Sequence, residues 1–182
     1  TQLNGNPTYF VEKIWKCLKT LNPEFYQNLI KVIDEKESIT PYPVDDSVFN
    51  NCMPKMHTIR KDEKDRWNEC RNIHFVINAR QKNMKQFAPV LPVASTQKIE
   101  IKYKHFDKEE LSISKPFNAI CTILIDDKFY GDAYLYQGKV RQSSHTIKPL
   151  IENDGFDNED EFFEYFNSDF IGKIIHWTDL KY

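Results

Sequence analysis

Residues 117–126 read Phe-Asn-Ala-Ile-Cys-Thr-Ile-Leu-Ile-Asp, and this stretch gives the clearest indication of the fold. It is apolar and rich in β-branched side chains, which is typical of a strand. Asp126 and Asp127 then predict a turn into residues 128–130. Upstream, residues 97–103 (Gln-Lys-Ile-Glu-Ile-Lys-Tyr) alternate polar and apolar side chains, as a half-exposed strand does. The centre of the chain is therefore expected to form a sheet.

Helical spacing of apolar side chains occurs toward both ends of the chain. Asn158 is a typical N-cap, and the acids after it are expected on a solvated helix face. Gly155 is expected to end the preceding helix in a left-handed conformation. Residues 37–54 contain three prolines without a clear period and predict an ordered loop. The expected helices cover residues 7–21, 23–36, 147–153 and 158–166. Further strands are expected at residues 73–79 and 173–178, and Gly172 is expected to lie just before the second of these.

This order of elements lacks the regular alternation of strand and helix that builds a parallel sheet. It predicts an α+β fold with a small, curved, mainly antiparallel β-barrel and flanking helices. A length of 182 residues suits one medium domain, or a small domain with an appendage. We accordingly expect an N-terminal helical elaboration at residues 1–52, packed on a barrel domain at residues 53–182.

The charge pattern excludes a uniformly basic nucleic-acid binder, because the formal net charge is −2. Charge is nevertheless uneven, since residues 55–108 are rich in Lys, Arg and His and residues 152–169 are acidic. Two interpretations stay open, a dipolar surface or two ordinary solvated faces. Lys82, Lys85 and Lys98 are most simply interpreted as solvent-facing side chains.

Cysteine and histidine usage predicts no metal site and no cofactor. The four cysteines have no CxxC spacing, and the five histidines are dispersed without a zinc pattern. Without a secretory leader, reduced thiols in a cytoplasmic protein are the simplest expectation. No apolar run of 18 residues occurs, so no membrane span is predicted, and no membrane partner is expected.

Residues 55–60, Lys-Met-His-Thr-Ile-Arg, carry the densest set of reactive groups. If residues 57–60 are extended, His57 and Ile59 face one way and Thr58 and Arg60 the other. Lys55 precedes the strand and can curl back over Thr58. Two uses stay open from the residues alone: an amine can activate a hydroxyl nucleophile, or an amine and a guanidinium can bind a phosphate or carboxylate.

Residues 55–60, followed by Trp67 and a strand from near Ile73, resemble the signature of ASCH domains. These are small barrels related to the PUA fold and are associated with RNA recognition. Residues 153–156 (Asn-Asp-Gly-Phe) resemble the acidic-Gly-Phe helix entry of that family, and residues 174–177 resemble its last barrel strand. The resemblance spans residues 53–178. It departs from the family pattern at Met53 and Pro54, where a glycine usually precedes the lysine, at Cys70 in place of another glycine, and at residues 18–51, which form an insertion.

The resemblance implies recognition of a nucleic acid or modified nucleotide in a cleft. Cationic side chains would hold phosphates, aromatic rings would stack a base, and Asp154 would bind amino groups on the base edge. The expected partner is RNA, single-stranded nucleic acid or a nucleotide. The ligand-binding residues are then Lys55, His57, Arg60, Arg66, Trp67, Tyr103 and Asp154.

Two further functions stay open. One branch of the family resembles amidohydrolases that remove an acyl group from a modified pyrimidine nucleoside with a Lys, a Thr three positions later and an acid. Lys55, Thr58 and Asp154 match that pattern, with Glu152 as the second candidate for the acid. Enzymatic activity, whether of this hydrolase type or ribonuclease-like, is thus undecided by the residues. The other function is binding of a protein partner through residues 19–52, which would present Tyr26, Tyr42 and Phe49.

Overall fold

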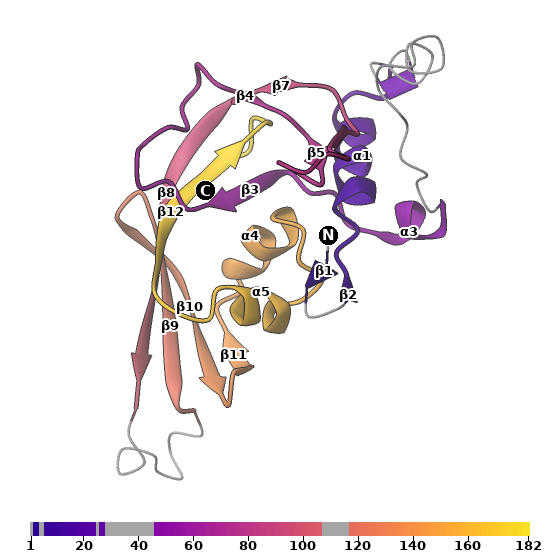
Figure 1. The fold of residues 1–182 in the computed structure, drawn as a ribbon. Helices are drawn as coiled ribbons and strands as arrows, with labels where there is room; N and C mark the ends of the chain where they lie inside the picture. Colours follow the sequence, from indigo (N-terminus) through magenta and orange to yellow (C-terminus); the bar gives the residue numbers. More distant parts are fainter. Residues whose placement is uncertain (1, 4–5, 25, 28–45, 107–116) are drawn as a thin grey trace.

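The dominant element is a curled antiparallel sheet of six strands that forms a half-barrel (Figure 1). The structure, a computed structural model, describes residues 2–3, 6–24, 26–27, 46–106 and 117–182. The strand order is β11-β10-β9-β8-β12-β3, and every neighbouring pair is antiparallel. The bounds are β3 His57–Arg60, β8 Ser95–His105, β9 Ala119–Ile125, β10 Lys128–Tyr136, β11 Lys139–Ser143 and β12 Phe170–His176. The chain is therefore α+β with a curved sheet, as predicted.

Alternating side chains explain why the central strands form. In β9 every second residue is buried, and the strand joins β10 through a two-residue turn. Asp126 and Asp127 occupy that turn with φ of 50° and 63°. Positive φ at both central residues is the condition for a tight hairpin turn that matches the strand twist. The predicted strand and turn at residues 117–130 are thus confirmed.

Two helices lie against the concave side of the sheet, α4 (Ile147–Asn153) and α5 (Glu159–Tyr165) (Figure 1). Both are confirmed predictions. The side chain of Asn158 accepts a hydrogen bond from the backbone N–H of Glu161 at 2.9 Å, which caps α5. Gly155 follows α4 with φ of 89°, the left-handed conformation expected at a helix end. The helices and the sheet enclose the first apolar cluster, which includes Ile99, Ile123, Leu150, Phe162 and Ile174.

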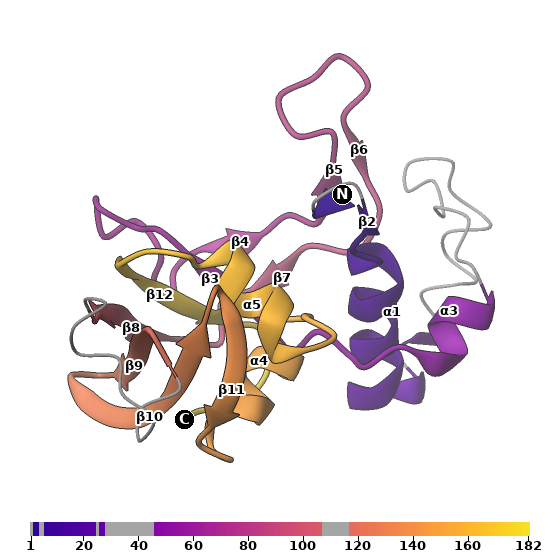
Figure 2. The same ribbon diagram turned by 90° about the horizontal axis from the view of Figure 1, so that it is seen from below.

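A second apolar cluster lies between helix α1 (Phe10–Leu21) and the outer side of the sheet. It includes Trp15, Phe75 and Trp177. Short paired strands complete this side of the molecule, and none of their elements is longer than two residues (Figure 2). They are β1 Gln2–Leu3 with β2 Asn6–Pro7, β4 Asn72–Ile73 with β7 Leu91–Pro92, and β5 Val76–Ile77 with β6 Lys85–Gln86.

Three predicted elements differ from the structure. The strand expected at residues 73–79 is divided between β4 and β5, because the chain leaves one partner strand and pairs with another. Gly172 lies inside β12 rather than before it, and a glycine is needed there because a Cβ would collide with the Arg60 carbonyl of the neighbouring strand. Within the expected loop at residues 37–54, Asp46–Asn51 form helix α3. The helix expected at residues 23–36 falls largely outside the described residues.

Helix α3 bears on the predicted partner surface at residues 19–52. Phe49 is buried and stacks with the Tyr26 ring at a centroid distance of 6.5 Å, so Phe49 is not presented to a partner. The Lys16 ammonium donates to the carbonyls of Phe49 and Asn50 and fixes α3 against α1. Tyr42 lies outside the described residues. No helix in the described part of the chain is long and apolar enough to cross a membrane.

Candidate functional site

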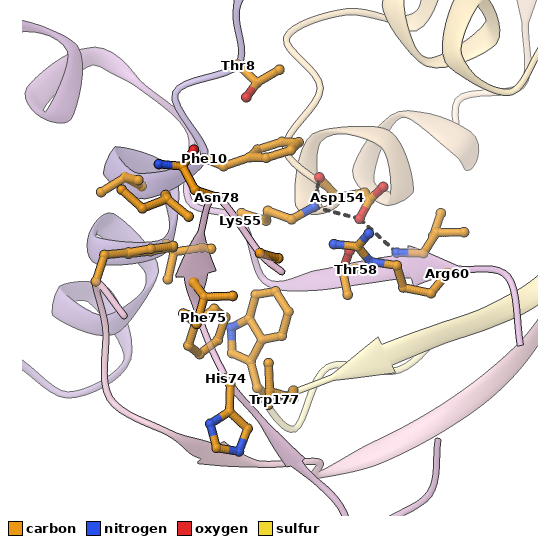
Figure 3. A pocket seen from close by; sticks show the side chains of 18 of the residues that line it. Thr8, Phe10, Lys55, Thr58, Arg60, His74, Phe75, Asn78, Asp154 and Trp177 are labelled. Carbon is orange, nitrogen blue, oxygen red and sulfur yellow. Dashed lines mark hydrogen bonds and ion pairs between the residues drawn. The ribbon is translucent and has the colours of Figure 1, made fainter. Parts of the chain in front are cut away.

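An ammonium and a carboxylate from distant segments meet in the interior of the molecule (Figure 3). The Lys55 Nζ donates to Oδ1 of Asp154 at 2.7 Å and also to the backbone carbonyl of Asp154. The same Oδ1 accepts a hydrogen bond from the backbone N–H of Ile59 at 3.0 Å. The side chains of Lys55 and Asp154 are 6% and 5% exposed. This pair therefore joins the start of β3 to the end of α4.

The backbone around this pair is shaped to receive the lysine. Lys55 precedes β3, and the N–H of the next residue, Met56, donates to the carbonyl of Asn153 at 2.8 Å. The turn after α4 then places Gly155 directly against the Lys55 stem. A Cβ at Gly155 would lie 3.1 Å from Cδ of Lys55, which is tighter than ordinary van der Waals contact. A glycine at this position thus serves both the left-handed turn and the lysine.

A second buried lysine, Lys13 of α1, also binds the turn after α4. Its Nζ donates to the Gly155 carbonyl at 2.8 Å and to Oδ1 of Asp157 at 2.5 Å. The backbone carbonyl of Lys13 accepts a hydrogen bond from the backbone N–H of Lys55 at 3.0 Å. Lys13 belongs to none of the sequence motifs. Its position three residues after Phe10 on the apolar stripe of α1 is the signal that would have found it.

The Lys55–Asp154 pair forms one side of a pocket of about 460 Å³, which is within the usual range for small-molecule sites. Thr58 and Arg60 line the same pocket, as expected for the two residues that share one face of β3. Phe10 lies over the ammonium, with its ring centroid 4.9 Å from Nζ of Lys55. The remaining wall is mostly apolar and aromatic, and it includes Val11, Ile14, Phe75, Val76, Ile77, Phe87, Phe156, Tyr165 and Trp177 (Figure 3).

Burial changes the acid–base properties of the pair. Desolvation lowers the pKa of the Lys55 ammonium, and the neighbouring carboxylate of Asp154 opposes this shift. Desolvation by itself would raise the pKa of the Asp154 carboxyl, but the Lys55 cation and the hydrogen bonds outweigh it, so that pKa is lowered. Asp154 is accordingly ionised at neutral pH. A lysine pKa displaced downward is the direction that a general base requires.

The structure does not bring all predicted ligand-binding residues to the pocket. His57 faces the opposite side of β3, where it is fully buried and its Nε2 lies 2.8 Å from the hydroxyl of Tyr182. Its Nδ1 lies 3.7 Å from Oδ1 of Asp154 and has no hydrogen-bond partner in the described residues. Desolvation lowers the pKa of His57. His57 therefore lies beside Asp154 and outside the pocket lining.

Arg66, Trp67 and Tyr103 also lie away from the pocket lining. Arg66 is exposed, and its Nε lies 4.0 Å from Oδ1 of Asp62, four residues earlier in the chain. Trp67 packs against the second apolar cluster. The hydroxyl of Tyr103 donates to the carbonyl of Phe166 at 2.5 Å, and its ring packs against the first apolar cluster. Glu152, the second candidate acid, instead lies 3.7 Å from Lys148 on the same helix.

For several pocket residues the sequence indicates only a structural role. The expected strands include Phe75 and Trp177, the expected helix at residues 7–21 includes Phe10, and no motif includes His74 or Asn78. No residue spacing connects these positions, so only the folded chain places them together. In the described residues, no group of three or more His, Cys, Asp or Glu side chains is arranged to hold a metal ion.

No family model matches the chain, and neither does a curated protein or a solved structure.

Proposed function

We propose that the pocket binds the base of a nucleotide or nucleic acid, in an ASCH-like domain with a PUA-like barrel. The observation that carries this proposal is the composition of one pocket of about 460 Å³. On one side it has an ammonium, a carboxylate, a hydroxyl and a guanidinium, and on the other it has aromatic rings. Stacking on aromatic rings combined with hydrogen bonds to the base edge is the usual way in which proteins recognise an unpaired base.

Each group has a part in this recognition. Both side-chain hydrogen bonds that Asp154 accepts in the described structure go to Oδ1, which leaves Oδ2 for amino groups on a base edge. Arg60 is exposed at the pocket and is suited to a phosphate. Phe75 and Trp177, which are 5% and 7% exposed, pack edge to face at a centroid distance of 5.3 Å and form part of the apolar pocket wall. The resemblance of residues 55–60 and 153–156 to ASCH motifs supports the same function.

A binding experiment with a matched pair of variants tests the proposal. Nucleosides, nucleoside monophosphates and short RNAs are titrated into the protein by calorimetry, with Arg60→Gln and Arg66→Gln as variants. Both arginines are exposed, but only Arg60 lines the pocket. We expect Arg60→Gln to weaken binding of a monophosphate about tenfold and Arg66→Gln to leave it unchanged. Absence of binding by all three ligand classes, or equal effects of the two variants, would contradict the proposal.

Hydrolysis of an acylated pyrimidine nucleoside is a second candidate function. It is favoured by the lowered pKa of Lys55 and by the presence of Thr58 in the same pocket. The Lys55 amine would remove the proton of the Thr58 hydroxyl as its oxygen attacks the acyl carbon. The nucleoside amine would leave with that proton, and water would then hydrolyse the acyl-threonine ester.

Release of cytidine from N-acetylcytidine, followed by chromatography, tests this second function. We expect release by the parent protein and by Thr58→Ser, but not by Thr58→Val, which keeps the shape of the side chain without the hydroxyl. Equal rates for the parent and Thr58→Val would exclude threonine as the nucleophile. Binding of nucleosides without any release would leave the first function standing alone.

A further inference from the structure

One stretch of the chain is basic without any acidic residue. From Cys70 to Ile99 the sequence has no Asp or Glu, although the whole chain contains 27 of them. The same stretch has five Lys or Arg residues. One of the five, Lys98, is paired with Glu100 and Asp127, whereas Arg80, Lys82 and Lys85 lie together in one hairpin.

Part of this stretch is a hairpin that forms a wall of the pocket. Strands β5 and β6 pair, and Figure 2 shows their connection projecting from the body of the molecule beside α1. Val76, Ile77, Asn78 and Ala79 line the pocket from the base of this hairpin. Its tip is ordered by backbone hydrogen bonds from Gln81 to Asn78 at 3.0 Å and from Met84 to Gln81 at 3.1 Å.

The cations of this hairpin are available for a ligand. Arg80, Lys82 and Lys85 are exposed, and no acidic side chain in the described ranges lies within ion-pair distance of them. Several lysines elsewhere in the described structure, among them Lys139 and Lys173, do have an acidic neighbour. Arg60, on the β3 side of the pocket, likewise has no acidic partner among the described residues. Unpaired cations therefore continue from the pocket along the hairpin.

We infer that the β5–β6 hairpin, residues 76–86, holds the phosphate backbone of a single strand of nucleic acid whose unpaired base occupies the pocket. This inference rests on the proposed function and names its ligand as a strand instead of a free nucleotide. A mononucleotide has a single phosphate group, which Arg60 suffices to bind. Phosphates of neighbouring nucleotides would engage Arg80, Lys82 and Lys85, whose charge is otherwise uncompensated.

Comparison of oligomers with monomers tests the inference. Labelled octanucleotides of each of the four bases, as RNA and as DNA, are titrated by fluorescence anisotropy, and the four nucleoside monophosphates are titrated by calorimetry. The variants are Arg80→Gln/Lys82→Gln/Lys85→Gln and the control Lys104→Gln/Lys128→Gln/Lys139→Gln, which removes three exposed cations from strands of the half-barrel. Circular dichroism and melting curves verify that both variants keep the fold.

We expect the best octanucleotide to bind at least about tenfold more tightly than its monophosphate. The hairpin variant should lose most of this advantage, and its slope of log affinity against log salt should decrease by about two, as expected for three lost contacts to a single strand. The control variant should retain both the advantage and the slope.

The outcomes separate this inference from the proposed function. If monophosphates bind in the Arg60-dependent way but octanucleotides gain nothing, or the two triple variants behave alike, the strand is excluded and the pocket function remains. If octanucleotides bind through the hairpin but no variant at Arg60 affects them, the pocket function fails. Displacement of the octanucleotides by polyglutamate at equal charge would identify an acidic protein as the partner and overturn the inference.

Discussion

At the scale of single residues, Gly155 leaves the space that the side chain of the buried Lys55 occupies. It combines a φ of 89° with a Cβ direction that points at the Lys55 stem. Gly138 also has a positive φ, 76°, but a Cβ there would meet no atom within 4 Å. The two glycines therefore differ in their contacts and share a left-handed backbone.

This difference gives a prediction for two alanine variants. Gly138→Ala should lower the free energy of unfolding by about 1 kcal/mol, the cost of a left-handed alanine. Gly155→Ala should cost clearly more, because Lys55 must also move from Asp154. Denaturant unfolding measures both values, and equal losses would mean that the Lys55 stem adapts freely.

His176 predicts a pH dependence of stability. Burial lowers its pKa to about 4, and His57 and Lys181 act in the same direction while Asp126 opposes them. The folded protein thus resists protonation at a pH where an unfolded histidine, with a pKa near 6.5, accepts a proton. This stability contribution is complete above pH 6.5 and is lost as the pH falls from 6.5 toward 4.

Unfolding free energies measured between pH 4.5 and 6.5 check this prediction. They should increase with pH by up to about 1.4 kcal/mol per unit through His176, and the lowered pKa of the buried His57 acts in the same direction. His176→Gln should make the profile flatter, whereas His145→Gln, at an exposed position, should not. A profile that His176→Gln leaves unaltered would contradict the assignment.

At the scale of elements, helix α5 does more than cover the apolar cluster. Its first-turn acids were expected on a solvated face, but Asp160 accepts the backbone N–H of Val140 at 2.8 Å and Glu159 accepts the Ser143 hydroxyl at 2.8 Å. Both donors belong to β11, the outermost strand of the sheet. The start of α5 therefore binds polar groups of an edge strand, and an edge strand with free backbone groups can pair with other chains.

The cap of α5 gives a prediction at this scale. Asn158→Ala removes the hydrogen bond to the N–H of Glu161 and should cost about 1 kcal/mol of unfolding free energy. Asn158→Asp retains an acceptor and should cost much less. Thermal melts of the three proteins measure the order, and a neutral alanine variant would show that contacts with β11 hold the helix without its cap.

At the scale of the whole molecule, strand β12 joins the two apolar clusters. Ile174 is fully buried in the first cluster, and Ile175, on the other face, is 1% exposed in the second. Lys13 and Lys55 add polar bonds between α1, β3 and the turn after α4. Helix α1 is thus packed and hydrogen-bonded against the half-barrel.

This arrangement predicts a single unfolding transition. Tryptophan fluorescence from Trp15 and Trp177 in the second cluster should change at the same denaturant concentration as the far-UV circular dichroism of the sheet. Ile174→Ala and Ile175→Ala should each lower stability by about 2–5 kcal/mol and shift both signals together. Ile171→Ala, at a position 62% exposed on the same strand, is the control. Separate transitions would indicate two independent units.

The sequence by itself determined the elements whose cause is local. Alternation in β9, the turn at Asp126 and Asp127, the bounds of α4 and the Asn158 cap all depend on residues a few positions apart. It also singled out Lys55 and Asp154, through short motifs.

Only the tertiary structure decided which groups share a site. It brought Lys55 to Asp154 across 99 positions of sequence, added Lys13, Phe75 and Trp177, and placed Tyr103 elsewhere. Local patterns define the faces of a helix or strand, but the meeting of two faces depends on the order of strands in the sheet and on the packing of side chains from distant segments.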